Sequence, residues 1–396
     1  MNAKINGSWA TVLVSGEGNG GRTVFALDVT NTVNASDGSI NGPTPLWQKS
    51  DVNMGRSYSK PTVIRTKIAG SEAWLAIYAS GPGITTDVGD TLYAVNLADG
   101  TLMWTFNIGD ANCFIASDIT ASETDDESGT EIDGFIDRVF FADNKGRIWK
   151  VDPGNNFVTG GEIQEVGSTV DVGLTHRALF STRVTVGGLG EDRAISGTLT
   201  AATDFTNRLV LYFGTGGTED TPAAAQNAFY AVYADSGDIR SKLDGSNGIA
   251  AGVKFYGGVV FESGQIVFTS GQDLSGLGLC APSAGKIVAI DANTFDLQFE
   301  QETNSKIVAP VFAQNGEIYT VTLTGNIYAS AFMGSGGGVA AGGGGGGGGA
   351  AMGGGGGGGA GGGSGGAGGG GGGGGSGSGL SNETKPFNII AWRQVY

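Results

Sequence analysis

The side chains in this sequence that are best suited to bind a metal ion form an acidic segment just before a short apolar run. Its carboxylate side chains are Asp125, Asp126, Glu127, Glu131, Asp133 and Asp137. Ca²⁺ takes about six to eight oxygen ligands from closely spaced carboxylates and a backbone carbonyl, with Gly where the loop turns sharply. Asp133 precedes Gly134, and Phe135 stands where a carbonyl ligand is expected. The segment therefore predicts a Ca²⁺ loop.

This predicted loop matches the pattern D-x-[D/N]-x-D-G-x-x-D only in its second half, because Gly129 and Glu131 occupy the first two ligand positions. Carboxylates from the preceding residues are then needed to complete the ligand set. The candidate ligands are Asp125, Glu127, Glu131, Asp133, the Phe135 carbonyl and Asp137. The alternative is a solvated Asp-Gly turn between two strands, with Ile136 in the core.

A strand hairpin follows the acidic segment. Apolar residues at 139–142 alternate between two faces, residues 143–146 predict a tight turn, and residues 148–149 begin a return strand. The same unit of an apolar strand, a turn with Gly and an apolar return strand recurs along the chain. Examples are GRTVFALDVT at 21, GDTLYAVNLADGTLMW at 89, NAFYAVYADSGDI at 227 and GKIVAIDANTFDLQF at 285.

Recurring hairpins of this kind are typical of the blades of a β-propeller, in which neighbouring blades bury each other's faces. Helical periodicity is nearly absent. The predicted strands cover residues 11–15, 23–29, 62–66, 74–80, 91–97, 102–106, 138–143, 147–152, 208–214, 228–234, 257–263, 265–271, 286–292, 297–301, 310–314, 317–323, 326–332 and 388–396. The sequence therefore predicts an all-β fold, a partial or modified propeller. A β-sandwich ranks second, because it gives no reason for the repeated hairpin.

A glycine block interrupts this pattern, since 34 of the 46 residues from Gly334 to Gly379 are Gly. Such a run has almost no apolar side chain to bury and loses much backbone entropy on ordering. We expect residues 1–333 to form the blades, 334–379 a low-complexity insertion, and 380–396 the closing strand. The block is either a disordered linker or a set of glycine helices of the polyproline II type packed side by side.

Composition excludes several kinds of partner. The chain has 396 residues and a net charge of −16, which disfavours nucleic acid and anionic membrane surfaces.

No stretch is long and apolar enough to span a bilayer. The first residues do not have the pattern of a signal peptide. If the protein is exported, we expect that this chain has lost an N-terminal portion or travels by another route.

Few residues are suited to catalysis or to transition metals. His176 is the only histidine, and the two cysteines, Cys113 and Cys280, form no metal-binding motif, which argues against zinc, haem and His-based triads. The cysteines form either one disulfide or two partly buried thiols. The Gly-rich residues 16–21 precede a strand, not a helix, so we interpret them as a turn and not as a phosphate loop.

Four further segments, together with the hairpin, resemble one known family. They are WATVLVSGEGNGGRTVFALDVT (9–30), SYSKPTVIRT (57–66) with AWLAIYASG (73–81), VLYFGTGG (210–217) and AWRQVY (391–396). The most specific match is DGFIDRVFFADNKGRIWKVD (133–152), which is similar to D-G-x-x-D-R-x-Y-x-G-D-x-x-G-N-x-W-R-F-D. In these segments the chain resembles the C-terminal β-propeller of the PilC/PilY-type type IV pilus tip adhesins.

This resemblance implies a non-catalytic pilus biogenesis factor and adhesin at the pilus tip or outer surface of a Gram-negative bacterium. It implies minor pilins and a host or abiotic surface as partners, a role in twitching motility, and Ca²⁺ control of pilus extension and retraction. The family's Ca²⁺ ligands carry over to Asp133, Asp137 and the Phe135 carbonyl. The family's N-terminal region and the first part of its propeller are absent. We therefore expect upstream sequence or another chain to complete the ring, since an open ring exposes strand edges.

Two alternative functions remain open. Hairpins such as LYAVNLADGTLMW (92–104) are similar to the tryptophan repeat of PQQ-type quinoprotein dehydrogenases. The vicinal Cys-Cys ring of those enzymes is absent, and Trp104 and Trp149 are better interpreted as packing between blades. The second alternative is a scaffold propeller of the outer-membrane assembly type.

Overall fold

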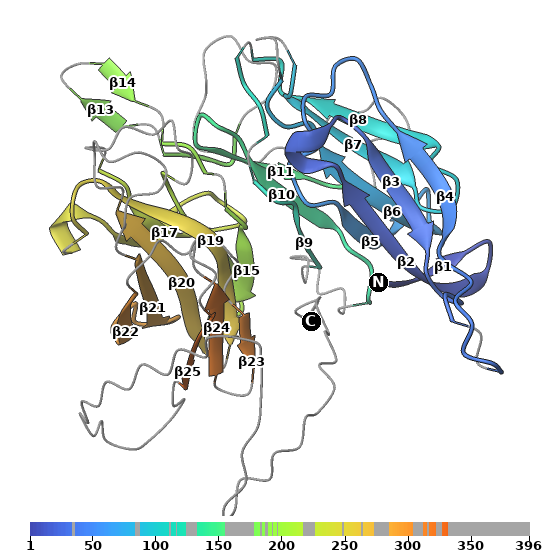
Figure 1. The fold of residues 1–396 in the computed structure, drawn as a ribbon. Coiled ribbons are helices and arrows are strands. Elements are labelled where there is room, and N and C mark those ends of the chain that lie inside the picture. Colours follow the sequence, from blue (N-terminus) through green and yellow to red (C-terminus); the bar gives the residue numbers. More distant parts are fainter. Residues whose placement is uncertain are drawn as a thin grey trace, which may run out of the picture. The chain divides into compact units, whose positions relative to one another are not determined.

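The fold is seen in a computed structural model of the chain (Figure 1). The structure describes residues 1–33, 36–83, 88–110, 112–115, 117–123, 133–154, 178–182, 184–186, 189–191, 193–195, 197–216, 226–247, 249–262, 264–272, 285–303, 312–314, 317–321 and 327–331. The predicted insertion at 334–379 and the predicted closing strand at 380–396 lie outside these residues, as does Cys280.

Six antiparallel sheets follow one another along the described part of the chain, and within each sheet neighbouring strands are consecutive in sequence. We call these sheets blades 1 to 6. Blade 1 contains β1 (Asn2–Ile5), β2 (Ser8–Gly16), β3 (Val24–Asp28) and β4 (Thr44–Lys49). Blade 2 contains β5 (Thr62–Ile68), β6 (Ser71–Ala79), β7 (Thr91–Asn96) and β8 (Leu102–Asn107). Blade 3 contains β9 (Thr120–Ser122), β10 (Arg138–Ala142), β11 (Arg147–Val151) and β12 (Phe180–Ser181).

The later blades repeat this arrangement. Blade 4 contains β15 (Thr200–Thr203), β16 (Leu209–Gly214), β17 (Phe229–Tyr233) and β18 (Ile239–Leu243). Blade 5 contains β19 (Val253–Glu262), β20 (Gln265–Gln272), β21 (Gly285–Asp291) and β22 (Leu297–Thr303). Blade 6 has three described strands, β23 (Phe312–Gln314), β24 (Glu317–Val321) and β25 (Ile327–Ala331). A separate hairpin, β13 (Val184–Val186) and β14 (Leu189–Glu191), lies between blades 3 and 4 in sequence.

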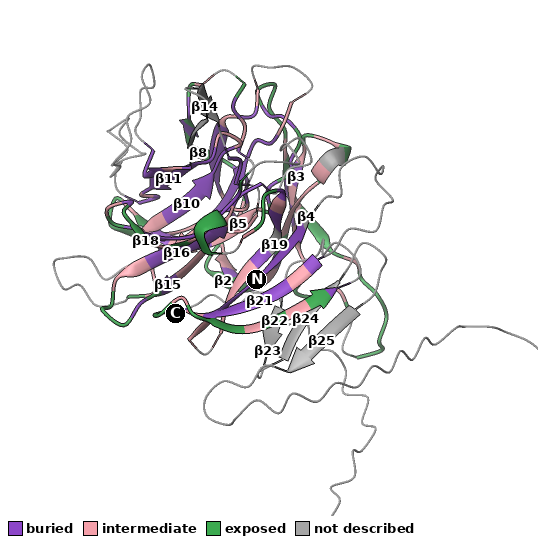
Figure 2. Cartoon of the chain, turned by 90° about the vertical axis from the view of Figure 1, so that its left-hand side faces the viewer, coloured by how far each residue is buried: buried purple, intermediate pink, exposed green. Residues whose placement is uncertain are grey.

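The two faces of a blade pack into two different cores. On β10, Val139 and Phe141 belong to a core shared with blade 2, whereas Phe140 and Ala142 belong to a core shared with blade 4. All four side chains are fully buried, and β10 is purple along most of its length in Figure 2. Successive strand residues point to opposite faces, so the alternation predicted for residues 139–142 serves two interfaces at once.

The same division of faces extends from blade 1 to blade 5. Tyr93 and Val95 of β7 pack with blade 1, while Leu92 and Ala94 pack with blade 3. The remaining described core joins blades 4 and 5, through residues such as Tyr212 and Phe268. A sandwich has one core between two sheets, whereas these sheets stack in series. The described part of the chain therefore has the β-propeller architecture predicted from the repeated hairpins, and the sandwich alternative is wrong.

The two tryptophans considered for a cofactor role are packing residues. Trp104 is 5% exposed and Trp149 is fully buried, and both lie in the core between blades 2 and 3. Trp149 also contacts Phe106 of blade 2, with 5.7 Å between ring centroids. These contacts match the interpretation of both side chains as packing between blades.

The repeated unit of an aromatic residue or Val, then Ala, then an apolar residue forms a β-bulge in the same place in four blades. The register with the fourth strand shifts at Ala26/Leu27, Ala94/Val95, Ala231/Val232 and Ala289/Ile290. A bulge bends its strand and increases the local twist. The turns that follow in blades 2 and 4 contain Gly100 and Gly237, with φ of +70° and +76°. Gly adopts such angles at little cost.

The Gly-rich residues 16–21 form a connection between β2 and β3 that includes a 3-10 turn at Gly18–Gly20, as predicted.

In blades 2, 4 and 5, a backbone carbonyl just after the third strand accepts a hydrogen bond from a side chain of the preceding blade. The carbonyls of Leu97, Ala234 and Ala292 each follow the third strand of their blade. Their donors are the Trp47 indole at 2.8 Å, the Lys150 ammonium at 3.0 Å and the Arg240 guanidinium at 2.8 Å, respectively. Three different side chains therefore make an equivalent link between neighbouring blades.

Lys150 is expected to make stability depend on pH. Burial, followed by the charge of Arg138, lowers the pKa of the Lys150 ammonium to about 8, from an ordinary value of 10.5. As pH falls from 10.5 to 8 the unfolded chain takes up this proton first, so the folded state loses relative stability. Relative to Lys150→Met, the wild type should therefore gain about 1–3 kcal/mol in free energy of unfolding between pH 8 and pH 10.5. Urea denaturation at several pH values measures the difference, and a constant difference would contradict the prediction.

Candidate functional site

The predicted Ca²⁺ loop ends in a tight turn immediately before β10. The Asp133 side-chain Oδ1 accepts a hydrogen bond from the Phe135 amide at 3.1 Å. Gly134 has φ of +79°, and its amide donates to Glu123 Oε1 at 2.7 Å. An Asp that bonds to the amide two residues ahead, followed by a residue of positive φ, forms a sharp turn. The turn predicted for Asp133 and Gly134 is confirmed.

Strand β5 of blade 2 fixes the backbone of this turn. The Ile136 amide donates to the Arg65 carbonyl at 2.7 Å, and the Thr66 hydroxyl donates to the Ile136 carbonyl at 2.8 Å. The Ile136 side chain is 5% exposed and packs in the core between blades 2 and 3. The turn is therefore anchored on a neighbouring blade, and Ile136 is a core residue, as the alternative interpretation of the turn expected.

Two cationic side chains of β5 lie against the turn. The Lys67 ammonium forms an ion pair with Asp133 Oδ2 and lies 4.4 Å from the centroid of the Phe135 ring. The Arg65 guanidinium lies 3.9 Å from the same centroid and pairs with Glu72 at 3.0 Å. The hydrogen bond from Lys67 is the main cause that lowers the pKa of Asp133. Neither cation was predicted, because both come from a strand more than 60 residues earlier.

The predicted ligands divide into two groups. Asp133, Phe135 and Asp137 lie within one described turn, and the Asp137 carbonyl accepts a hydrogen bond from Arg138 at 2.7 Å. Asp125, Asp126, Glu127 and Glu131 lie outside the described residues. Within the described ranges, no group of three or more His, Cys, Asp or Glu side chains could hold a metal ion. The Ca²⁺ loop stays a prediction.

A second polar cluster, which sequence reasoning missed, surrounds Asp143 in the hairpin turn between β10 and β11. The Asp143 carboxylate is fully buried. It accepts hydrogen bonds from the Lys145 amide at 2.9 Å, the Arg147 amide at 3.0 Å, Arg147 Nε at 2.7 Å and the Trp149 indole at 3.0 Å. The segment was predicted as a turn, and the Asp at its first position was the available signal.

Residues from the loop after blade 2 complete this cluster. Arg147 pairs with Asp110 at 2.8 Å and donates to the Cys113 sulfur at 3.2 Å. Lys145 pairs with the other oxygen of Asp110 at 2.6 Å. Burial raises the pKa of the Asp143 carboxyl, and the Arg147 charge opposes that shift. Burial also raises the pKa of the Cys113 thiol. Cys113 is a free thiol in the structure, so of the two expectations for the cysteines, the buried thiol holds for Cys113.

The Asp143 cluster joins the connection after blade 2 to the hairpin of blade 3. Asn144 and Phe114 exchange two hydrogen bonds, from the Asn144 amide to the Phe114 carbonyl at 3.0 Å and from the Phe114 amide to Asn144 Oδ1 at 2.8 Å. Ile115 and Asp143 form a backbone bridge. A carboxylate with this many donors and no exposed surface is held in one position. We therefore assign the cluster a structural role between blades 2 and 3.

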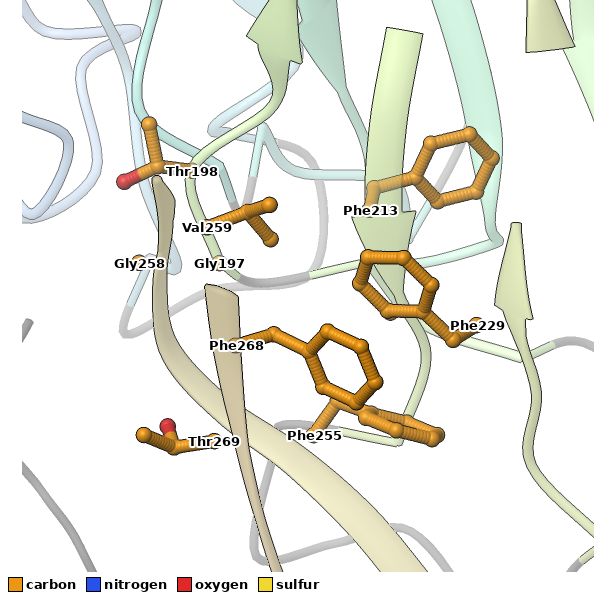
Figure 3. A pocket seen from close by; sticks show the side chains of 10 residues that line it. Gly197, Thr198, Phe213, Phe229, Phe255, Gly258, Val259, Phe268 and Thr269 are labelled. Carbon is orange, nitrogen blue, oxygen red and sulfur yellow. The ribbon is translucent and has the colours of Figure 1, made fainter. Parts of the chain in front are cut away.

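A small cavity lies between blades 4 and 5, lined by aromatic side chains (Figure 3). Phe229 and Phe268 stack there with ring centroids 4.0 Å apart, and Phe213 and Phe255 also line it. Its volume for the centre of a water molecule is about 10 Å³, which is room for about one water. Pockets for organic ligands are usually about 300–1,000 Å³, so this cavity is too small for a quinone cofactor.

Stacked four-stranded meanders define the class of protein as a β-propeller, and comparison with known proteins narrows this class. No protein-family model matches the sequence. The crystal structure of the Pseudomonas aeruginosa PilY1 C-terminal domain is similar in fold, with a TM-score of 0.56, 14% sequence identity and coverage of 83% of both chains. At this identity the structural likeness concerns the fold alone.

Sequence comparison finds the same kind of protein. The chain is 31% identical over 223 residues to a type IV pilus biogenesis factor PilY1 homolog of Xylella fastidiosa. It is 31% identical over 153 residues to the type IV pilus biogenesis factor PilY1 of Pseudomonas aeruginosa strain UCBPP-PA14. These matches span 54% and 38% of this chain, but only 14% and 12% of the relatives. The resemblance to a PilY1-type C-terminal propeller, predicted from the sequence, is confirmed.

Proposed function

We propose that this chain acts in type IV pilus biogenesis as a propeller of the PilY1 type. The observation that carries the proposal is the agreement between two comparisons, since PilY1 proteins match both the sequence and the fold. In this proposal the chain lies at the cell surface, at the pilus tip. It works by adhesion to a host or abiotic surface and by contact with minor pilins.

We further propose that this function depends on binding and not on catalysis. The relatives support this proposal, since both matched proteins are named as type IV pilus biogenesis factors. Among the described residues, no helix has the length and apolar character needed to cross a bilayer. A quinoprotein function predicts quinone absorbance after reconstitution with the cofactor, and such absorbance would overturn a purely binding role.

Affinity capture tests the proposed partners. The chain, carrying a tag, is expected to retain minor pilins when it is isolated from sheared extracellular appendages of cells that assemble pili. The same chain isolated from cells that lack the minor pilins serves as the control. Recovery of the tagged chain from the cell surface without any pilin, in repeated preparations, would contradict the proposal.

We also propose that Ca²⁺ regulates the protein through the Asp133 turn. Asp133, Asp137 and the Phe135 carbonyl would contribute oxygen ligands, and a bound Ca²⁺ would supply the charge that holds these oxygens together. The observed turn fits this role, because Gly134 already has positive φ and the Asp133 carboxylate already holds a cation, the Lys67 ammonium. Carboxylates from the preceding acidic residues are required to complete the site.

Calcium is expected to raise the melting temperature through Asp133. A ligand that binds only the folded state, at about 100 times its dissociation constant, stabilises that state by about 2.7 kcal/mol. Asp133→Asn is expected to remove most of the Ca²⁺-induced shift measured by thermal denaturation, with EDTA as the reference. Asp37→Asn is the matched control, since Asp37 also bonds to the amide two residues ahead, at 2.8 Å, before a Gly with φ of +71°. An equal shift in both variants would exclude the Asp133 turn.

A further inference from the structure

Aromatic rings and charged side chains form one continuous surface strip across blades 1, 2 and 3. Trp9 of β2 is 64% exposed, and its ring meets the ring of Trp74 of β6 edge to face, with centroids 6.0 Å apart. The Lys4 ammonium of β1 lies 5.5 Å from the centroid of the Trp9 ring. These contacts orient an indole that is still largely open to solvent.

Glu72 links the two tryptophans to a third aromatic ring. Its carboxylate accepts hydrogen bonds from the Trp74 indole and from Arg65 Nε, both at 3.0 Å, and lies 3.7 Å from the Lys4 ammonium. The Arg65 guanidinium in turn lies 3.9 Å from the centroid of the Phe135 ring, in the turn before β10. The aromatic strip defined by these contacts consists of Lys4, Trp9, Arg65, Glu72, Trp74 and Phe135.

The aromatic strip offers hydrogen-bond donors beside its exposed ring. The Lys4 and Arg65 side chains are 37% and 33% exposed. The distance of 3.7 Å from Lys4 to Glu72 is too long for a hydrogen bond, so the ammonium keeps its donors for another acceptor. Within the described part of the chain, Arg65 bonds to Glu72 through Nε, which leaves the Nη groups of its guanidinium as further donors.

The charges on this surface nearly cancel. Lys4, Arg65 and the adjacent Lys67 are cationic, whereas Glu72 and Asp133 are anionic, and Lys67 pairs with Asp133. The whole chain has a net charge of −16, which repels a polyanion at long range. A ligand that fits the strip is therefore uncharged, has an apolar face for an exposed ring, and carries hydrogen-bond acceptors around that face.

We propose that the aromatic strip binds neutral carbohydrate on the surface to which the protein adheres. A pyranose ring presents C–H groups on one face and hydroxyl groups around its edge. The C–H groups stack on the negative face of the Trp9 indole, and the hydroxyl oxygens accept hydrogen bonds from Lys4 and Arg65. This inference rests on the proposed adhesive function, and it names the chemical class that the protein recognises.

The strip is better suited to a sugar than to a protein partner. Specific protein interfaces bury about 1,200–2,000 Å² in total, and peptides are usually bound along a sheet edge or in an apolar groove. The most exposed ring of the strip is the single indole of Trp9, whereas Trp74 and Phe135 are half-buried. One indole with donors beside it matches the size of one or two sugar units.

The test measures binding of the purified chain to two neutral probes, yeast mannan and N-acetyllactosamine coupled to albumin, by surface plasmon resonance. The wild type is expected to bind at least one of them. Trp9→Ala should weaken this binding at least about tenfold, because it removes the stacking surface. Lys4→Met, which keeps the length of the side chain but removes its donors, should weaken binding about two- to tenfold.

Phe205→Ala is the matched control for loss of an exposed aromatic side chain. Phe205 is 76% exposed and lies between β15 and β16 of blade 4, outside the strip. This variant should bind the probe as the wild type does. Trp9→Phe keeps a smaller ring and should bind more tightly than Trp9→Ala, which separates stacking from any effect on folding. Melting temperatures of all variants show whether each one is folded.

Each outcome decides between distinct conclusions. Failure of the folded wild type to bind either neutral probe would overturn the inference, and the proposed pilus function would stand if deletion of the gene still abolished pili. Equal binding by the wild type, Trp9→Ala and Lys4→Met would overturn the strip as the site. Binding to heparin alone would contradict the preference for an uncharged ligand. Loss of pilin capture in Trp9→Ala, with glycan binding unchanged, would instead assign the strip to a protein partner.

Discussion

Replacing Asp143 with Ala is expected to lower the free energy of unfolding by about 3–5 kcal/mol, as measured by urea denaturation. The carboxylate is the common acceptor for Arg147, Trp149 and the hairpin amides, and it is fully buried. Its removal leaves these donors without their acceptor in a place that water does not reach. Arg147 keeps its pair with Asp110 at 2.8 Å, which limits the loss.

Asp99→Ala provides the control for Asp143→Ala. Asp99 also precedes a blade turn, and it accepts a hydrogen bond from the Thr101 amide at 2.8 Å, but it is exposed. Its replacement should cost about 1 kcal/mol or less. Equal losses in the two variants would contradict the assignment of the Asp143 cluster as a link between blades 2 and 3.

Arg240→Met is expected to cause a loss of similar size, about 3–5 kcal/mol in the free energy of unfolding. Arg240 pairs with the buried Asp204 carboxylate at 3.3 Å, and these side chains are 7% and 1% exposed. Its guanidinium also donates to the Ala292 and Asn293 carbonyls of blade 5, both at 2.8 Å. The variant leaves a buried carboxylate without its cation and removes both links to the next blade.

Arg208→Met is the control for Arg240→Met. It tests whether the loss of an exposed arginine in blade 4 lowers the free energy of unfolding as much as the loss of the buried one. Arg208 pairs with Asp235 at 2.7 Å, but the two side chains are 41% and 56% exposed. Its guanidinium also lies 3.5 Å from the centroid of the Tyr233 ring. An exposed pair with such a contact should be worth about 1 kcal/mol. If Arg208→Met were as damaging as Arg240→Met, burial would not explain the effect.

The sequence was informative where a strand is buried on both faces. Residues 92–95 and 209–213 are continuous apolar runs, and they lie in β7 and β16, as the predicted strands at 91–97 and 208–214 expected. The fourth strands of blades 1, 3 and 4, which are β4, β12 and β18, were not predicted. β18 reads IRSKL and is largely intermediate or exposed, and β12 has two residues. Such strands form because the neighbouring strand offers hydrogen-bond partners, so their own composition carries little signal.

The candidate site shows the same limit at the level of single residues. Local sequence predicted the turn at Asp133, because Asp-Gly chemistry acts over two or three residues. It did not predict Lys67, which reaches Asp133 from 66 residues away. Likewise, Asp143 is a predicted turn residue, but Cys113 and Asp110 meet its partners only because the loop after blade 2 packs on blade 3. Contacts between blades follow from the stacked fold and not from local pattern.

The most direct test of the proposed function is a count of surface pili in a strain from which the gene for this protein has been deleted. Pili sheared from the cells are quantified by electron microscopy and by the amount of major pilin. The proposed role in pilus biogenesis predicts a strong loss of pili and of twitching motility, with both restored when the wild-type gene is returned. Normal numbers of pili and normal motility in the deletion strain would contradict it.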